Sequence, residues 1–384
     1  METRGYKRPV LGIIGGGQLG RMLIQAAVDL DVEVHIVDPD EDAPCRYLAK
    51  TFAHGNYRDY DTVLNFGNSL ANHNPVLTIE FEDINTQALE ELEGRGVRVY
   101  PQPRVIKLIQ DKGAQKQFYA DNGIPTAPFY FVQNKAEALA YADKGLFFQK
   151  LRRGGYDGKG VKKMATAEDF NAAYDAPSIL EELVPFEKEL SVIVARNPQG
   201  EVKAFPAVEM YFNPIANLVE FLFSPANITA EQEKRANDIA VQIAAKLEIV
   251  GILAVEMFLT KEGEILVNEM APRPHNSGHQ TIEGNITSQY EQHLRAILGL
   301  PLGDTSLIKP TAMLNLLGEP GFEGEAIYEG MDELLKIEGV YPHLYGKRFT
   351  KPYRKMGHIT VIADTVEELL VKTDKVKGVV KVKS

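Results

Sequence analysis

The chain has little of three features that would assign it to common classes of protein. Its 384 residues include a single cysteine, Cys45, which cannot form an internal disulfide and indicates a reduced thiol with a structural role. No stretch approaches about 18 apolar residues, and the first residues lack the apolar core of a signal peptide. We therefore expect a cytoplasmic protein with no membrane partner.

Basic residues are also in the minority, with 42 lysines and arginines against 53 acidic residues and a formal net charge of -11. Binding to nucleic acid or to an anionic membrane depends on clustered Lys and Arg, so neither is expected as the main partner. An anionic ligand would have to be bound by a local group of basic side chains. The length and a hydrophobic share of 44% predict two or three domains with sizeable cores.

The most informative pattern lies late in the chain, where apolar runs at residues 253–259 and 264–267 predict a hairpin. The hairpin would bring Glu256 and Glu269 onto one face, beside the amide oxygen of Asn268. Two carboxylates and an amide oxygen suit Mg²⁺ carrying nucleotide phosphates better than a metal that prefers thiolate or imidazole. The sequence therefore predicts a magnesium site at this hairpin.

Two further polar side chains follow the hairpin. Arg273 stands between two prolines, and His275 is a candidate for handling a proton. Two glutamates alone would be read as solvated strand residues, because exposed Glu is ordinary. The combination of paired Glu with Asn, Arg and His favours an active site over that alternative.

The amino-terminal segment predicts a β-α-β unit, with strands at residues 10–14 and 33–37 around a helix at 21–29. The intervening Gly15-Gly16-Gly17-Gln18-Leu19-Gly20, with Asp38 farther on, fits a dinucleotide fingerprint in which the acid holds a ribose. A nucleotide-binding oxidoreductase, or a non-catalytic nucleotide sensor, is therefore a rival hypothesis.

Two side chains of this part of the chain favour a different ligand. Gln18 is placed to reach a substrate at the strand ends, which counts against NAD. Glu80 directly follows a predicted strand at residues 76–79, where the ligand crevice of an open α/β sheet lies. Plain solvation of Glu80 is the alternative, because acids at strand ends are common on any surface.

The middle of the chain predicts a helix at residues 104–122, then a small α+β unit with strands at 125–132 and 146–150. Four glycines among residues 154–160 provide a loop whose backbone can close on a triphosphate. It lacks the order of a Walker A loop. A flexible surface hairpin is the alternative.

Charged residues around this loop suit a nucleotide. Lys150, with Lys159 or Arg153, would balance phosphate charge, and Asp157 would point toward the reacting group. Residues 178–184 predict an edge strand with backbone groups at the spacing that adenine requires, and Glu189 would bind ribose hydroxyls. Ordinary linker acids would look the same.

The carboxy-terminal stretch contains an island of positive charge. Residues 339–363 include no acidic residue, while basic residues crowd into the nine positions from Lys347 to Lys355. Arg and Lys together can bind a phosphate monoester through charge-assisted hydrogen bonds, so an anion pocket is expected. The alternative is a solvated hairpin whose basic residues protect an edge.

In chain order, these elements resemble the ATP-grasp superfamily: Lys112, Lys150, the glycine loop, Glu181 to Val184, Glu189, Glu256, Asn268 and Glu269. Within it, five motifs closely resemble the N5-carboxyaminoimidazole ribonucleotide synthetase family: Gly15 to Met22, Asp38-Pro39, Cys45-Arg46, Glu80-Phe81-Glu82 and Arg273 to His279. One departure is Tyr211-Phe212, where many members place a nucleotide-contacting His.

The resemblance implies an α/β fold, with α+β character in its central part. Residues 1–106 would form a Rossmann-like parallel-sheet domain, and 107–298 an ATP-grasp domain with a small mobile lid at about 125–185. Residues 299–384 would form a β-rich part that binds the substrate phosphate. A homodimer is also implied.

The resemblance implies roles for individual residues. ATP would be bound by Lys112, Lys150, Gly155, Tyr156, Asp157, Gly158, Lys159, Gly160, Glu181, Glu182, Leu183, Val184, Glu189, Asn268 and Glu269. The ribonucleotide would be bound by Gln18, Leu19, Glu80, Asn276, Lys347, Arg354 and Lys355. Magnesium ions would be held by Glu256 and Glu269, and the catalytic residues would be Asp157, Arg273 and His275.

The implied reaction is an ATP-dependent carboxylation of 5-aminoimidazole ribonucleotide with bicarbonate, through carboxyphosphate, in purine biosynthesis. The rival within the superfamily is the formate-dependent glycinamide ribonucleotide transformylase. That enzyme carries Glu where this chain has Gln18 and Asp where it has Asn276. Amide groups suit a neutral aminoimidazole because they both donate and accept hydrogen bonds, whereas carboxylates suit a charged amine.

Overall fold

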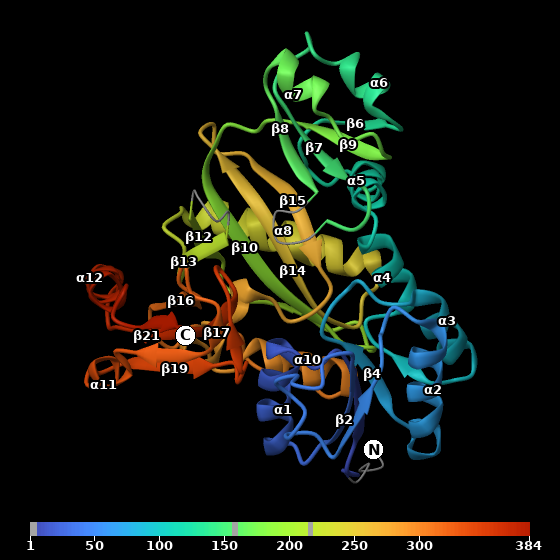
Figure 1. The fold of residues 1–384 in the computed structure, drawn as a ribbon, viewed down its shortest axis with the longest axis vertical. Coiled ribbons are helices and arrows are strands. Elements are labelled where there is room, and N and C mark those ends of the chain that lie inside the picture. Colours follow the sequence, from blue (N-terminus) through green and yellow to red (C-terminus); the bar gives the residue numbers. More distant parts are fainter. Residues whose placement is uncertain (1–5, 156–159, 214–217) are drawn as a thin grey trace.

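The computed structural model of the chain describes residues 6–155, 160–213 and 218–384. The amino-terminal elements lie at one end of the molecule, a small lid lies at the other, and a large sheet connects them (Figure 1). The carboxy-terminal strands β16, β21 and β19 continue this sheet to the side. Within the described residues, no helix combines the length and the apolar character needed to cross a membrane.

The amino-terminal domain is a parallel five-stranded sheet in the order β3-β2-β1-β4-β5. Its elements are β1 (Val10–Ile14), α1 (Gln18–Asp29), β2 (Glu33–Asp38), β3 (Thr51–His54), α2 (Tyr60–Leu70), η1 (Ala71–His73), β4 (Val76–Ile79), α3 (Thr86–Gly94) and β5 (Arg98–Val99). Because β1 and β4 are parallel neighbours, their carboxyl ends bring Glu80 close to the loop of residues 15–17 that precedes α1. The helix after β1 begins at Gln18, one turn earlier than predicted.

The single helix predicted at residues 104–122 is wrong. Two helices form instead, α4 (Pro103–Ile109) and α5 (Lys112–Asp121). Asp111 ends the continuity because its carboxylate caps α5, accepting hydrogen bonds from the amides of Gly113 at 2.9 Å and Ala114 at 3.2 Å. The break places Lys112 in the first turn of α5.

The lid is an antiparallel sheet in the order β6-β9-β7-β8. Its elements are β6 (Phe129–Val132), α6 (Lys135–Leu139), β7 (Phe147–Leu151), β8 (Val161–Met164), α7 (Ala167–Asn171) and β9 (Ser178–Glu182). The prediction that residues 178–184 form an edge strand is wrong, because β9 pairs with β6 on one side and β7 on the other.

The large sheet has nine strands, in the order β15-β14-β10-β12-β13-β16-β21-β19 with β11 beside β10. The first elements of this part of the chain are β10 (Phe186–Arg196), β11 (Val202–Ala204), β12 (Val208–Asn213), β13 (Leu218–Ser224), α8 (Ala230–Leu247), β14 (Gly251–Thr260), β15 (Ile265–Ala271), η2 (Asn276–Gly278), α9 (Thr281–Gly284) and α10 (Gln289–Leu298). All six of these strands belong to the large sheet. The elements that follow are β16 (Thr311–Leu317), β17 (Gly324–Glu325), β18 (Ile327–Glu329), α11 (Met331–Leu334), β19 (Val340–Leu344), β20 (Phe349–Thr350), β21 (Lys355–Ile362), α12 (Val366–Val376) and β22 (Lys381–Lys383). Of these, β16, β19 and β21 belong to the large sheet, whereas β17 pairs with β20 and β18 pairs with β22 in two separate small sheets. The sheet thus continues through the expected boundary at residues 298–299, and the domain limits stay predictions.

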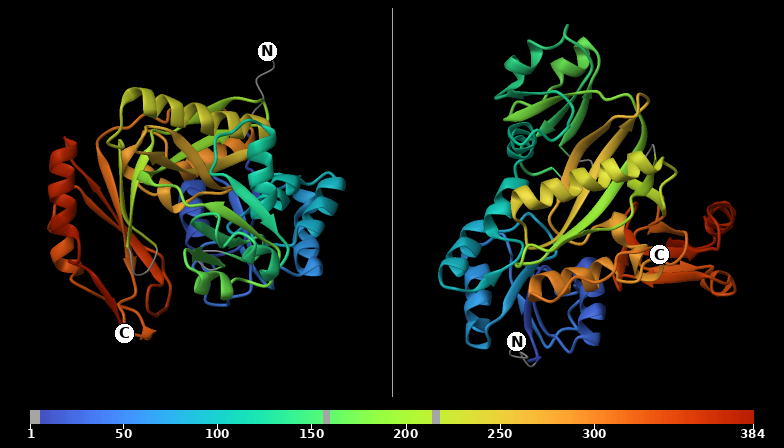
Figure 2. Two further views of the ribbon diagram at one scale, coloured as in Figure 1. Left: turned by 90° about the horizontal axis from the view of Figure 1, so that it is seen from above. Right: turned by 180° about the vertical axis from the view of Figure 1, so that it is seen from behind.

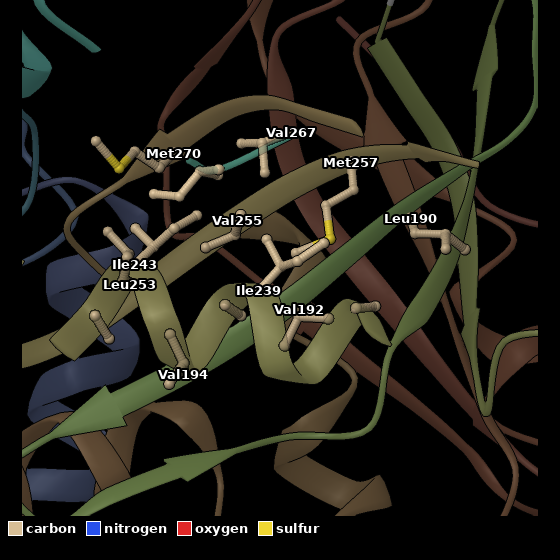
Figure 3. Close-up of a cluster of buried hydrophobic side chains, with 14 of the residues drawn as sticks. Leu190, Val192, Val194, Ile239, Ile243, Leu253, Val255, Met257, Val267 and Met270 are labelled. Carbon is tan, nitrogen blue, oxygen red and sulfur yellow. The ribbon is translucent and has the colours of Figure 1, made fainter. Parts of the chain in front are cut away.

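Helix α8 covers one face of this sheet (Figure 2). Leu253, Val255 and Met257 of β14 point into the apolar cluster beneath α8 (Figure 3). Because side chains alternate along a strand, Glu256 points to the opposite face. There α10 packs between β14 and helix α1 of the amino-terminal domain, so the opposite face of β14 lies toward that domain.

Candidate active site

Two glutamates face each other in the hairpin of β14 and β15. The predicted hairpin is confirmed, and Glu256 and Glu269 are direct cross-strand partners. The pairing register shifts immediately beside them, which leaves Asn268 as an extra residue in β15. A β-bulge of this kind redirects side chains and is frequent beside active sites.

The pKa values of the two carboxyl groups are shifted in opposite directions, partly because the groups lie close together. Burial raises the pKa of Glu256, and the neighbouring Glu269 and Glu189 raise it further. The ammonium group of Lys112 lowers the pKa of Glu269, assisted by Lys150. Two facing carboxylates with one destabilised anion form a site that a bound cation would stabilise.

Two lysines approach this pair from the lid side. The Nζ of Lys112 lies 2.5 Å from Oε2 of Glu269. The Nζ of Lys150 lies 2.9 Å from Oε2 of Glu181 and 3.0 Å from Oδ1 of Asn268. These five predicted nucleotide ligands therefore line one small pocket between α5, the lid and the hairpin.

A third lysine of the same pocket was not predicted. Lys116 is only 2% exposed, and its Nζ lies 2.7 Å from Oγ1 of Thr126 and 3.4 Å from Oε2 of Glu181. Burial lowers its pKa to about 8, against the opposing effect of Glu181. In the sequence it resembles any solvated lysine of an amphipathic helix, so only its neighbours reveal it.

The glycine loop is anchored at its entry. The guanidinium of Arg152 donates hydrogen bonds of 2.9 and 2.6 Å to the two oxygens of Asp111. Arg153, predicted to balance phosphate charge, lies 3.8 Å from the same carboxylate. At the other end, Gly160 has a φ of +74°, a conformation that favours glycine.

Part of the glycine loop lies outside the described residues. Tyr156, Asp157, Gly158 and Lys159 belong to this part, and the roles predicted for them stay predictions. Gly155 is described and lies beside Gly160, because a Cβ atom added to Gly160 would be 3.2 Å from the Cα atom of Gly155.

The residues predicted to bind adenine lie at the end of β9 and directly after it. The amide of Leu183 donates to the carbonyl of Leu146 at 2.9 Å, and Val184 accepts from Phe186 at 3.0 Å. Glu182 accepts a hydrogen bond of 2.8 Å from the hydroxyl of Tyr130. The backbone groups that pair β9 with β6 and β7 are occupied, as are the amide of Leu183 and the carbonyl of Val184. Adenine binding by this segment stays a prediction.

Glu189 points toward the same region from β10. Burial raises the pKa of Glu189 to about 7, and only Lys150 opposes this effect. Since Glu189 also raises the pKa of Glu256, it belongs to the same electrostatic group as the facing carboxylates.

In the amino-terminal domain, the side chain of Glu80 packs against the loop of residues 15–17 before α1. Its Oε1 accepts a hydrogen bond of 3.1 Å from the amide of Leu19. A Cβ atom at Gly17 would lie 2.5 Å from the same oxygen, so only glycine allows this approach. Burial raises the pKa of Glu80 to about 7, although Arg273 acts in the opposite direction. Gln18, the first residue of α1, stands at the same place.

Asp38 does not behave as the acid of a dinucleotide site. One of its oxygens accepts from the amide of Gly16 at 2.6 Å, and the other accepts from the amide of Asp40 at 2.7 Å. The side chain is buried and serves to hold the loop. This arrangement removes the main support for an oxidoreductase.

Arg273 is held by Glu82, across 191 positions of sequence. Its Nε lies 2.5 Å from Oε2 of Glu82, and its Nη2 lies 3.0 Å from Oε1. Such a two-bonded pair fixes the plane of the guanidinium. Glu82 carries this positioning role, for which the sequence contains no local signal.

His275 and Asn276 begin the turn that follows. Nε2 of His275 lies 3.7 Å from Oε1 of Glu256. Burial lowers the pKa of His275 to about 3, reinforced by the charges of Arg273 and Lys355, so the ring is neutral. Asn276 donates to Oδ1 of Asn315 at 2.9 Å, and Asn315 returns a bond of 3.1 Å.

The predicted basic group divides in two. Lys355 influences the pKa values of Glu256 and His275, and Lys347 influences that of Glu80, so both act on the central site. Arg354 instead donates a hydrogen bond of 2.6 Å to the carbonyl of Phe349.

Tyr211 stands near the position where many family members have a nucleotide-contacting His, and its side chain contacts residues of its own sheet. Its ring stacks on Phe221 with centroids 4.5 Å apart, and its hydroxyl donates to Oε1 of Glu209 at 2.7 Å. Glu209 in turn pairs with Lys188 at 3.1 Å.

Comparisons with known proteins agree with this architecture. Three family models match in succession: the ribonucleotide synthetase preATP-grasp domain at residues 9–110, the ATP-grasp domain at 117–290, and the phosphoribosylaminoimidazole carboxylase C-terminal domain at 311–372. The fold predicted from the sequence, an ATP-grasp fold with an amino-terminal parallel-sheet domain, is thereby confirmed.

Several relatives match over nearly the whole chain. The N5-carboxyaminoimidazole ribonucleotide synthase of Bacillus subtilis is 41% identical over 94% of this chain and 94% of its own length. The chloroplastic phosphoribosylaminoimidazole carboxylase of Vigna aconitifolia is 39% identical over 95% of this chain, which spans 66% of that longer protein.

Solved structures agree as well. The N5-carboxyaminoimidazole ribonucleotide synthetase of Thermotoga maritima superposes with a TM-score of 0.90 at 41% identity, covering 98% of this chain and 99% of that one. The Aspergillus clavatus synthase, in complex with ADP and 5-aminoimidazole ribonucleotide, superposes with a TM-score of 0.87 at 31% identity, covering 97% and 98%. The chain belongs to the N5-carboxyaminoimidazole ribonucleotide synthase family of ATP-grasp ligases.

Proposed function

We propose that this chain carboxylates the exocyclic amine of 5-aminoimidazole ribonucleotide with bicarbonate, converting ATP to ADP and phosphate, in purine biosynthesis. The observation that carries the proposal is the facing pair of Glu256 and Glu269. Lysines reach this pair from the lid side, while Arg273 and His275 follow β15 toward the amino-terminal domain. Nucleotide chemistry and oxyacid chemistry thus meet at one hairpin.

The donor set suits Mg²⁺. Glu256, Glu269 and the amide oxygen of Asn268 are hard oxygen donors, which this ion prefers. Among the described ranges, no group of three or more His, Cys, Asp or Glu is arranged to hold a metal by itself. That fits an ion that retains water and substrate phosphates as further ligands. When bound, Mg²⁺ would neutralise charge on the phosphates of ATP.

The first step is phosphoryl transfer. An oxygen of bicarbonate attacks the γ-phosphorus, the bond from phosphorus to the bridging oxygen breaks, and carboxyphosphate and ADP form. Catalysis of this step depends on positioning and charge neutralisation. Lys112 and Lys150 supply positive charge beside the glutamates, and the glycine loop from Gly155 to Gly160 would close over the phosphates.

In the second step the amine attacks the carboxyl carbon, either in carboxyphosphate itself or in CO₂ that carboxyphosphate releases. A carbon–nitrogen bond forms, the carbon–oxygen bond to phosphate breaks, and the nitrogen loses a proton. Arg273, oriented by Glu82, would stabilise the negative charge on the oxyacid. His275 would exchange a hydrogen bond or a proton with the same oxyacid.

The ribonucleotide would lie between the amino-terminal domain and the carboxy-terminal strands. Gln18, the amide of Leu19 and Glu80 would meet the aminoimidazole, and Asn276 would offer a further amide. Lys347, Arg354 and Lys355 would bind the 5′-phosphate. Lys347 and Glu80 interact electrostatically, which supports a single pocket shared by the two parts.

One coupled assay tests the proposal. Phosphate release should require 5-aminoimidazole ribonucleotide, ATP and bicarbonate together, and it should stop in a degassed buffer without bicarbonate. Turnover with formate and glycinamide ribonucleotide would instead support the transformylase. From the resemblance alone we also propose a cytoplasmic homodimer. Light scattering of the purified enzyme would test the dimer, because it measures the molar mass of the particle in solution.

A further inference from the structure

Two buried serines connect His275 to the interior of the large sheet. Oγ of Ser277 lies 2.9 Å from Nδ1 of His275, and Oγ of Ser191 lies 2.8 Å from Oγ of Ser277. Ser191 is 1% exposed and Ser277 is fully buried. The three side chains form a continuous hydrogen-bonded chain from β10 to the site.

The direction of this chain follows from a backbone group. The amide of Ser277 donates to Nδ1 of His275 at 3.4 Å, which caps the η2 turn. An amide can only donate, so Nδ1 carries a lone pair and no hydrogen. The hydroxyl of Ser277 therefore also donates to Nδ1, and its oxygen accepts the hydrogen of Ser191.

The same contact indicates which tautomer the ring adopts. A neutral imidazole whose Nδ1 is an acceptor carries its hydrogen on Nε2. That nitrogen is the one beside Glu256, 3.7 Å from Oε1. Ser191 reaches this position because it is the cross-strand partner of Glu256, so both side chains lie on the polar face of the sheet.

We propose that Ser191 and Ser277 are positioning residues that hold His275 as a hydrogen-bond donor, with Nε2–H directed at the oxyacid. This proposal rests on the proposed function and deepens it. A fixed donor that faces developing negative charge stabilises it without reorganisation. In this tautomer His275 cannot accept the proton of the amine, because Nε2 already carries a hydrogen and Nδ1 accepts hydrogen bonds from Ser277. The proton of the amine then leaves with another acceptor, such as the departing phosphate.

The tautomer is tested directly by NMR on the intact enzyme without substrates. Two-bond ¹H–¹⁵N correlation spectra of protein labelled with ¹⁵N-histidine distinguish the two tautomers, and His275→Asn identifies the signal among the eight histidines. We expect the Nε2–H tautomer in the wild type. An Nδ1–H tautomer or a doubly protonated ring would overturn the proposal. This result does not depend on which reaction the enzyme catalyses.

Kinetics test the consequence. Ser277→Ala and Ser191→Ala should each lower kcat about 10-fold, as observed when groups that orient a site residue are removed. The KM for ATP should stay within about twofold, and Ser191→Thr, which keeps the hydroxyl, should recover most of the loss. Ser224→Ala is the matched control, because Ser224 is a fully buried serine of the same sheet that bonds to the carbonyl of Ala207.

The outcomes separate the two proposals. Unchanged kcat in both alanine variants, or an equal loss in Ser224→Ala, would refute the positioning role. A wild-type enzyme that shows the Nε2–H tautomer but no bicarbonate-dependent turnover would refute the proposed function and leave the serine chain intact.

Discussion

The two faces of strand β14 are stabilised in different ways, one fully buried and apolar, the other only half-buried at Glu256. Leu253, Val255 and Met257 lie beneath α8 in a purely apolar cluster (Figure 3). Burial of apolar area stabilises that face without any directional partner. On the other face, Glu256 and Ser191 depend on specific neighbours, because a buried polar group without a partner is costly.

This difference separates folding from chemistry within one hairpin. The apolar face should tolerate loss of volume at a cost in stability alone. A change of charge on the polar face should cost far more in activity than in stability, because the loss of repulsion between the two carboxylates offsets part of the lost pairing with Lys112. Substitutions at Glu269 and at Leu253 test the two sides of this comparison.

The largest effect is expected at Glu269. Glu269→Gln keeps the shape but removes the charge that pairs with Lys112 and that we assign to the metal. ATP turnover should fall by about 10³-fold or more, because charge neutralisation at the phosphates dominates phosphoryl transfer. The coupled phosphate-release assay measures this loss. The midpoint of thermal unfolding should change little.

A control at the tip of the same hairpin supports the interpretation. Glu262 is exposed in the turn between β14 and β15, so Glu262→Gln should leave turnover unchanged. Normal turnover in Glu269→Gln would remove that residue from the metal site.

The apolar face should respond in the opposite manner. Leu253→Ala deletes a fully buried side chain and should lower the free energy of unfolding by about 2–5 kcal/mol. Denaturant titration measures this change, and kcat of the folded enzyme should remain near the wild-type value. A large loss of kcat without destabilisation would contradict the separation of the two faces.

A smaller effect is expected at Arg354. Arg354→Ala should raise the KM for 5-aminoimidazole ribonucleotide about 10- to 100-fold, the value of one or two charge-assisted hydrogen bonds, with little change for ATP. Steady-state kinetics with each substrate varied in turn measures both constants. Arg348, exposed and paired with Glu325 at 3.7 Å, is the matched control. Equal increases for both substrates would refute the phosphate assignment.

The smallest effect is expected from Glu80 as a function of pH. Its pKa in the folded protein is raised from 4.5 to about 7, so the folded state binds the proton more tightly than the unfolded state does. Stability should therefore decrease as the pH rises between these values, and the full penalty should be present above about pH 7. Glu80→Gln has no proton to lose and should lack this decrease.

Denaturation of both proteins at about pH 5 and about pH 8 measures the difference, with an expected gain for Glu80→Gln of about 1–3 kcal/mol at the higher pH. A gain of the same size at both pH values would show that ionisation of Glu80 is not the cause.

Much of this arrangement could be predicted from local patterns. Alternating apolar residues and a turn identified the hairpin of Glu256 and Glu269, and the glycine loop before α1 identified a β-α-β unit. Such signals are local in sequence, and the physics that produces them is local too.

The remaining features depend on contacts between distant residues. The extra residue Asn268 is set by pairing between strands, and the position of β9 inside the lid sheet depends on β6 and β7. Glu82 and Arg273 meet only after the amino-terminal domain docks. Asp111 is the exception, because Asp is a common N-cap residue and is a local signal for a helix start. The helical pattern on both sides of it nevertheless favoured one continuous helix.

The central claim is that ATP activates bicarbonate at the glutamate pair by forming carboxyphosphate. Turnover with freshly prepared ¹⁸O-bicarbonate, followed by mass analysis of the inorganic phosphate, tests it most directly. Transfer of one labelled oxygen to phosphate in each turnover is the predicted result. Phosphate that contains no label, in a reaction that still depends on bicarbonate, would contradict the account.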